Sequence, residues 1–163
     1  MAEPAAPTFI ADVNVGKLAR WLRVMGFDTL MFEGTEDSDL VRAALAGGRI
    51  ILTRDSHIAS RRLVREGRLK AVLITSDNLD DQVRQVVREL GLPHDFRPFT
   101  RCLECNQPLV ERTPEEVRER VPPYVFRTQT GYMECPRCHR IYWRGTHWQA
   151  MTDRLKRTLA DAP

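Results

Sequence analysis

The chain has 163 residues, of which 42% are hydrophobic, and a formal net charge of +3. This length fits one ordinary domain, or one small domain followed by a metal-stabilised module. No apolar run approaches the roughly 18 residues of a membrane-spanning helix, which excludes that class of membrane protein. Residues 1–7 have no basic region and no apolar stretch after them, so they do not resemble a signal peptide, and we expect a cytoplasmic protein.

The two parts of the chain differ in charge. Residues 1–95 hold 13 Lys and Arg against 14 Asp and Glu, a balance of −1, whereas residues 96–163 hold 12 against 8, a balance of +4. Nearly all of the basic residues are arginine, whose guanidinium group makes bidentate contacts with phosphates. The C-terminal part therefore favours a nucleic-acid partner, although a GC-rich genome would also explain the arginine bias.

The N-terminal part alternates strand and helix patterns. Short apolar runs at 8–11, 29–32, 50–53 and 71–75 are typical of buried strands. Helical periodicity covers 15–25, 37–46, 56–66 and 79–90. This alternation predicts parallel strands joined by right-handed crossovers, and hence a three-layer α/β sandwich over residues 1–95. The order of the strands in the sheet stays open.

The pattern breaks in residues 93–101, which contain two prolines, and we place the domain boundary there. Within the second part, residues 96–163, Thr113, Pro114 and Glu116 form a capping-box sequence that predicts a short helix. We expect short strands at 125–127 and 141–143, and a closing helix at 149–159.

Two C-x-x-C pairs, Cys102 with Cys105 and Cys135 with Cys138, lie in this second part with 29 residues between them. Each pair can wrap a tight turn, and two such turns supply a closed tetrahedron of thiolates, which suits structural Zn²⁺. Iron in a rubredoxin-like site and free or disulfide-bonded cysteines are the alternatives. Residues 101–148 are too few and too polar to form a core alone, so we expect metal binding to supply much of their folding free energy.

Acidic residues follow the predicted strands. Asp12, Asp55 and Asp77 come at or just after strand ends, and Asp37 and Asp39 begin a predicted helix. Ligands of parallel α/β sheets bind beyond the carboxyl ends of the strands, and converging carboxylates suit Mg²⁺ or Mn²⁺. Such a site can activate water for phosphodiester cleavage. Helix capping is the alternative explanation for each aspartate.

The segment from Phe9 to Asp28 resembles the opening of the Mut-seven C-terminal ribonuclease family. The segments 37–41 and 49–55 are similar to the second and third acidic motifs of that family, and 142–148 is similar to its ribbon signature. The resemblance covers roughly residues 8–155. It implies a PIN-like ribonuclease domain followed by a zinc ribbon, with Asp12, Asp37 and Asp55 as metal ligands and Asp77 as a variable fourth catalytic acid.

The function that we expect is a metal-dependent ribonuclease. The alternative is an RNA-binding or ribosome-associated adaptor, with ribosome or tRNA as partner and a degenerate acidic site. A phosphorylation-responsive receiver fits less well, because Asp12 has no acidic neighbour. The oligomeric state and the RNA substrate stay open.

The residues that could bind RNA are Lys17, Arg20, Arg54, Arg101, Arg127, Arg137, Arg140 and Arg144. Four aromatic residues, Tyr124, Tyr142, Trp143 and Trp148, are available for base stacking or for the ribbon core.

Overall fold

The computed structural model describes residues 5–94 and 96–160. Residues 1–4, on which part of the signal-peptide argument rests, lie outside the described residues. Within residues 5–94 and 96–160, no helix combines the length and the apolar character needed to cross a bilayer.

The N-terminal part is built on four parallel strands, as predicted. They are β1 (Phe9–Ala11), β2 (Thr29–Met31), β3 (Ile50–Thr53) and β4 (Ala71–Leu73), and their order in the sheet is β2-β1-β3-β4. Because all four run the same way, the sheet has an amino edge, where the strands begin, and a carboxyl edge, where they end. The two central strands are the most deeply buried.

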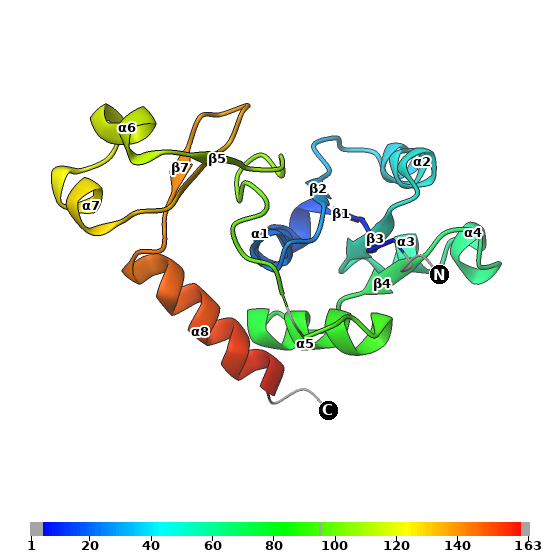
Figure 1. The fold of residues 1–163 in the computed structure, drawn as a ribbon. Helices are drawn as coiled ribbons and strands as arrows, with labels where there is room; N and C mark the ends of the chain where they lie inside the picture. The colour runs from blue at the N-terminus through cyan, green and yellow to red at the C-terminus, as the bar shows by residue number, and fades with distance from the viewer. Residues whose placement is uncertain (1–4, 95, 161–163) are drawn as a thin grey trace.

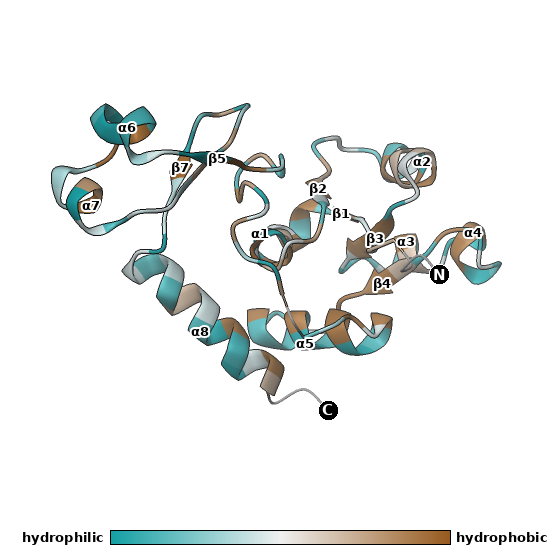
Figure 2. Ribbon diagram, viewed as in Figure 1, coloured by the Kyte–Doolittle hydropathy of each residue, from teal (hydrophilic) through white to brown (hydrophobic). Residues whose placement is uncertain are grey.

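Helices cover both faces of this sheet (Figure 1), so the predicted α/β sandwich is confirmed. One face packs against α1 and α5, and α8 joins the same hydrophobic cluster through Leu155 and Leu159. Figure 2 shows that α5 carries its apolar residues along one side, as an amphipathic helix must. The helices of the first cluster are α1 (Gly16–Val24), α5 (Leu79–Leu90) and α8 (Thr146–Ala160), and those of the second are α2 (Asp37–Gly47), α3 (Ser56–Ala59) and α4 (Arg62–Arg65).

One predicted helix is divided. The single helix expected at 56–66 is wrong, because Arg61 adopts an extended backbone, with ψ 149°, between α3 and α4. The break lets Ile58 on one side and Leu63 and Val64 on the other pack on the same cluster. The surrounding elements decide where these side chains must pack. The apolar periodicity of residues 56–66 alone does not show that the helix has to break there.

The second part holds a three-stranded antiparallel sheet in the order β5-β6-β7. The capping box is confirmed, since the Glu116 amide donates to Thr113 Oγ1 at 3.3 Å and the Glu116 carboxylate accepts from the Thr113 amide at 3.2 Å. The strand predicted at 125–127 is wrong, because these residues lie in α7, which begins with proline and turns Val125 into the ribbon core. The elements are β5 (Val110–Arg112), α6 (Pro114–Val117), the 3-10 helix η2 (Arg118–Arg120), α7 (Pro123–Thr128), β6 (Tyr132–Glu134) and β7 (Ile141–Tyr142).

A polar joint fixes the second part to the amino edge of the sheet. Asn106 Oδ1 accepts from the Thr29 amide at 2.9 Å, and Asn106 Nδ2 donates to Asp28 Oδ1 at 2.6 Å. Both Asn106 and Thr29 are buried. Arg49 completes the joint with two hydrogen bonds to the Asp28 carboxylate, at 2.7 and 3.2 Å. Burial raises the pKa of Asp28, but the hydrogen bonds from Arg49 and Asn106 outweigh it and hold this pKa below its usual value.

The linker also lies close against the first part. The Arg97 amide donates to the Met25 carbonyl at 2.9 Å. Gly26 has φ +98°, and a Cβ on it would lie 2.9 Å from the Arg97 carbonyl oxygen. Only glycine satisfies both the left-handed backbone and this close approach.

The closing helix α8 returns from the ribbon to the first part (Figure 1). It begins at Thr146, three residues earlier than predicted, and its far end packs on α5. Asp80 of α5 accepts hydrogen bonds from Arg154 at 3.0 Å and from Thr158 at 3.1 Å. Residues of α8 therefore contribute to the core of the N-terminal part, although they follow the ribbon in the chain.

The Asp80 contacts predict a pH dependence of stability. Burial raises the pKa of Asp80, but the hydrogen bonds from Arg154 and Thr158 outweigh it and lower this pKa. An aspartate in the unfolded chain has a pKa of about 4, and the stabilisation that Asp80 gives the folded state should be complete above that pH. It should be lost as the pH falls through the lower pKa that Asp80 has in the folded state. We expect Asp80→Asn to reduce the free energy of unfolding by about 1 kcal/mol at pH 7, because the carboxylate is one-third exposed. The difference from wild type should shrink in urea titrations towards pH 3, and a difference that is constant with pH would contradict this account.

Candidate active site and metal centre

A buried threonine joins two of the predicted catalytic residues at the carboxyl edge. Asp12 follows β1 and Asp55 follows β3, the neighbouring strand. Thr53 is fully buried; its hydroxyl donates to Asp12 Oδ2 at 2.8 Å and accepts from the Asp55 amide at 3.0 Å. Neighbouring parallel strands thus bring Asp12 and Asp55 to one place, as the sequence predicts, and Thr53 holds the two segments together.

Asn14 extends this arrangement. Its Nδ2 lies 3.4 Å from Asp12 Oδ2, and its Oδ1 accepts from the Arg54 amide at 3.2 Å. Sequence reasoning gave Thr53 no role. The signal that could have identified Thr53 is a hydroxyl at the last position of a strand that ends beside two aspartates.

Both aspartates also cap helices. Asp12 Oδ1 accepts from the Val13 amide at 2.8 Å at the start of η1 (Val13–Val15), and Asp55 Oδ1 accepts from the His57 amide at 2.8 Å at the start of α3. A carboxylate offers about four lone-pair positions, so these bonds leave capacity for a cation. Capping and metal binding are therefore compatible for this pair.

Capping does not explain the other two predicted acids. Asp37 lies in the first turn of α2, whose N-cap is Glu36, and Asn78 rather than Asp77 caps α5, accepting from the Asp81 amide at 3.1 Å. Asp37 is half-buried and Asp77 is exposed, on segments that leave the same sheet edge. Asp39, the neighbour of Asp37, instead pairs with Arg42 at 2.8 Å.

The carboxylates do not form a closed cluster. Over residues 5–94 and 96–160, the four cysteines are the one set of three or more His, Cys, Asp or Glu side chains whose ligand atoms all lie within 4.8 Å of one another. Lys17, at the start of α1, and Arg54, just after β3, are both exposed beside the acidic edge.

The four cysteines gather in the ribbon, as predicted. Cys102 Sγ and Cys138 Sγ are 3.7 Å apart, close to the edge of about 3.8 Å that a tetrahedron of thiolates around Zn²⁺ requires. None of the four is in a disulfide. The donor set therefore fits a structural metal ion.

The two C-x-x-C turns have the same backbone geometry. Asn106 and His139, one residue after each pair, have φ of 66° and 63°. In each turn, the amide of that residue donates to the carbonyl of the first cysteine at 2.9 Å, and the amide of the second cysteine lies 3.4 Å from the first sulfur. This shared geometry turns both sulfurs of each pair towards one point. In the first turn, Asn106 also makes the joint to the sheet.

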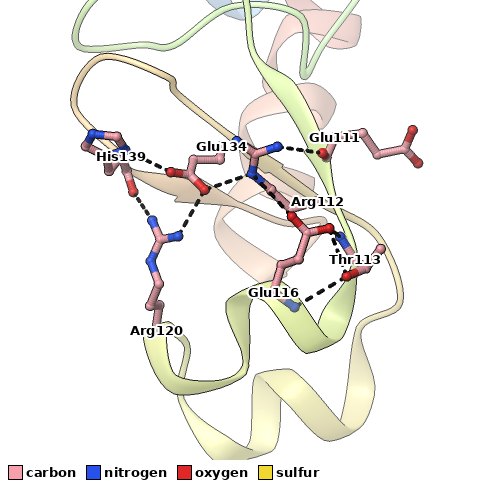
Figure 3. A network of polar contacts seen from close by, with 7 residues as sticks. All are labelled: Glu111, Arg112, Thr113, Glu116, Arg120, Glu134 and His139. Carbon is pink, nitrogen blue, oxygen red and sulfur yellow. Dashed lines mark hydrogen bonds and ion pairs between the residues drawn. The ribbon is translucent and has the colours of Figure 1, made fainter.

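A buried glutamate organises the ribbon around the second turn (Figure 3). The Glu134 carboxylate accepts from Arg120 at 2.9 Å, from His139 Nδ1 at 2.9 Å and from Arg112 at 3.1 Å. Arg120 also donates to the His139 carbonyl at 2.7 Å. The hydrogen bonds from Arg120 and His139 lower the pKa of Glu134 to about 2, so it is ionised at neutral pH. Glu134 thereby links η2, β5 and the second cysteine turn.

The predicted RNA-binding residues lie in separate places. Lys17 and Arg54 lie at the carboxyl edge, whereas Arg20 pairs with Glu104 of the first cysteine turn. Arg137 and Arg140 are exposed on or beside the second turn. Arg144 lies over the rings of Phe99 and Trp148, at 5.9 and 5.3 Å. Arg101 donates to the Asn106 carbonyl at 2.9 Å, and Arg127 is exposed on α7.

The aromatic residues divide between core and surface. The Tyr142 hydroxyl accepts from the Leu103 amide at 3.1 Å and lies 3.1 Å from Cys102 Sγ. Trp143 packs against the ribbon core, and Trp148 packs on Phe99 with ring centroids 5.2 Å apart. Tyr124, by contrast, is 62% exposed. The alternative that some of these residues form a small core is confirmed for Trp143.

The cysteine geometry predicts about one zinc ion per chain by elemental analysis. Cys105→Ser should abolish stoichiometric zinc and unfold the ribbon, because the ribbon strands are short and thiolate–metal bonds supply much of their stability. His147→Ala, which removes an exposed histidine outside the four-cysteine set, should keep the zinc content unchanged. Iron in place of zinc, or full zinc retention in Cys105→Ser, would contradict this prediction.

The Glu134 network predicts faster zinc release when its charge is removed. Glu134→Gln should reduce the stability of the ribbon by about 1–3 kcal/mol, because charged hydrogen bonds with Arg112 and Arg120 are lost. The measurement is the rate of zinc transfer to a competing chelator at neutral pH. Glu111→Gln is the matched control, since the Glu111 side chain points away from the network (Figure 3). Equal release rates in the two variants would show that Glu134 has no role in holding the second turn.

The sequence comparisons agree with this architecture. A family model described as the Mut7-C RNAse domain matches residues 7–155. No curated protein and no solved structure gives a significant match. The matched region spans both the four-stranded parallel sheet and the four-cysteine ribbon. The chain therefore belongs to the Mut7-C RNAse domain family.

Proposed function

We propose that this protein is a metal-dependent ribonuclease whose active site is the carboxyl edge of the parallel sheet. The observation that carries the proposal is the Asp12–Thr53–Asp55 arrangement, found in a chain of an RNAse family. Asp12, Asp37 and Asp55 would hold Mg²⁺ or Mn²⁺, and Asp77 would be the fourth acid. A bound divalent cation supplies an activated water and positive charge beside the scissile phosphate.

The residues around these acids have separate tasks in this proposal. Thr53 fixes Asp12 and Asp55 relative to each other, because its one hydroxyl bonds both segments. Asn14 holds the loop after β1 against the loop after β3. Lys17 and Arg54 are exposed beside the acids and would neutralise the phosphates on either side of the cut.

A second function is supported by a different observation. Asp12 and Asp55 cap helices, and within the described residues no three carboxylates lie within 4.8 Å of one another. An RNA-binding adaptor, on the ribosome or on tRNA, would need the caps and the basic ribbon but no catalytic metal. The two functions differ in cleavage alone, so cleavage is the measurement that separates them.

Several further properties belong to the same proposal. The resemblance supports a PIN-like arrangement for residues 1–95 and a zinc ribbon for residues 96–163, with Zn²⁺ as the ion of the four cysteines. RNA is the substrate that the family implies. We also propose that the protein acts in the cytoplasm, where free cysteines stay reduced and available to a metal.

The first test is cleavage of end-labelled RNA in Mn²⁺. We expect Asp12→Asn to lower the rate of cleavage roughly 100-fold or more, since loss even of an outer-shell partner costs 10–100-fold at metal sites. Asparagine caps helices as well as aspartate does, so the fold should survive. Glu66→Gln, which removes an acid just after α4, is the control. If wild type binds RNA but cuts none of the single-stranded and structured substrates, the adaptor is the correct function.

The second test is the salt dependence of RNA binding without Mn²⁺. Each lost phosphate contact should reduce the slope of log K against log salt by about 0.7 for a single strand. Lys17→Gln combined with Arg54→Gln should therefore reduce it by about 1.4. Arg62→Gln on α4, with a side chain that is 82% exposed, is the matched control. An unchanged slope in the double variant would show that Lys17 and Arg54 do not contact the phosphates of the bound RNA.

A further inference from the structure

A cleft of about 660 Å³ lies between the ribbon, the end of α1 and the start of α8. Its walls come from segments far apart in the chain, and they combine arginines with aromatic rings. The cleft is distinct from the acidic edge, because none of its lining residues is one of the four aspartates proposed there. The residues used below are Arg20, Arg101, Glu104, Tyr124, Arg140 and Trp148.

The charge of the cleft is positive. Three arginines and one glutamate line it, and the glutamate, Glu104, is already paired with Arg20. The first turn of α8 also lines the cleft, and the amino end of a helix favours anions. The cleft is therefore suited to an anionic ligand.

Two aromatic residues line the cleft without the contacts that such residues usually make inside a protein. Tyr124 is 62% exposed on α7 and belongs to no core cluster. The indole Nε1 of Trp148 is buried, and no acceptor contacts it in residues 5–94 or 96–160. The exposed Tyr124 ring, in a cleft lined by arginines, suits a planar base that can stack on it.

The cleft lies at the opposite edge of the sheet from the proposed active site. The first cysteine turn contacts Thr29, where β2 begins, whereas Asp12 and Asp55 follow the ends of β1 and β3. Helix α1 runs from one edge to the other, with Lys17 near its start and the cleft residues Arg20 and Val24 at its middle and its end. Its nine residues span about 13 Å at 1.5 Å per residue.

We propose that the cleft binds an unpaired segment of the RNA substrate at a distance from the cut. This inference rests on the proposed function for the position of the cut. A stacked strand advances about 3.4 Å per nucleotide, so roughly four nucleotides cover the length of α1. The preferred substrate is then RNA in which a single-stranded tract of about that length or more separates the scissile bond from the bases held in the cleft. A blunt duplex, whose bases are covered, would not use the cleft.

The test is binding of a fluorescent single-stranded oligouridine and of a blunt duplex RNA, in the absence of Mn²⁺, to the full-length zinc-loaded protein. Wild type should prefer the single strand. Tyr124→Ala should weaken single-strand binding about 5- to 100-fold, as expected when one stacked base is lost, and leave duplex binding unchanged. Tyr124→Phe keeps the ring and should bind as wild type. Leu45→Ala removes another exposed apolar side chain, on α2, and is the matched control.

The outcomes separate this inference from the nuclease proposal. If Tyr124→Ala binds the single strand as wild type does, or if wild type binds duplex and single strand equally, the cleft does not hold unpaired RNA. A peptide rather than a nucleic acid would then be the ligand to examine. If binding behaves as expected but Mn²⁺-dependent cleavage is absent, the cleft inference stands for an adaptor and the nuclease proposal fails. If cleavage occurs, its rate should rise as the unpaired tract is lengthened to about four nucleotides, and a rate independent of that length would overturn the spacing.

Discussion

The position of the ribbon depends on the polar joint made by Asn106, Asp28 and Arg49. Asn106 follows the first cysteine pair, so the turn that would wrap the metal is the same turn that contacts the sheet. Polar groups buried in this joint need partners, because each unpaired one would cost about 1–3 kcal/mol. The joint therefore admits one docking position for the turn. The cleft and the start of α8 follow from that position, since both are built partly from the ribbon.

Parallel strand direction separates the two charged regions of the molecule. All strands of the main sheet end at one edge, where Asp12, Asp37, Asp55 and Asp77 follow them, and begin at the other, where the basic ribbon docks. In an antiparallel sheet, strands begin and end at both edges, so the acidic and the basic region would have been mixed. The separation keeps the ribbon arginines from neutralising the carboxylates that a metal ion would need, and it leaves α1 as the connection between the regions. Any substrate that uses both must extend along that distance.

The acidic edge shows how one side chain can cap a helix and still offer oxygen atoms to a ligand. Asp12 and Asp55 each use one oxygen to cap a helix. The buried Thr53 hydroxyl fixes their relative position, because it bonds the Asp12 carboxylate and the Asp55 amide. Held by backbone amides, these carboxylates lose little rotational freedom when a cation binds, which is the condition for a preorganised site. Asp37 and Asp77 lack a capping role and retain more freedom. This difference divides the four acids into a fixed pair and a pair able to adjust to a ligand.

Local pattern by itself determined the alternation of strands and helices, the four-cysteine centre, the capping box at Thr113 and the placement of Asp12 and Asp55 at the same edge of the sheet. These features depend on periodic burial, on short covalent spacing or on the shared direction of neighbouring strands, all of which can be read from adjacent residues. Only the tertiary structure decided the strand order, the break at Arg61, the helix in place of a strand at Val125, and the partner of Arg20. Glu104 lies 84 residues from Arg20 in the chain, and it meets Arg20 because Asn106 docks the first cysteine turn on the sheet. Contacts of this kind depend on how two separately folded surfaces fit together, and no local periodicity encodes that fit.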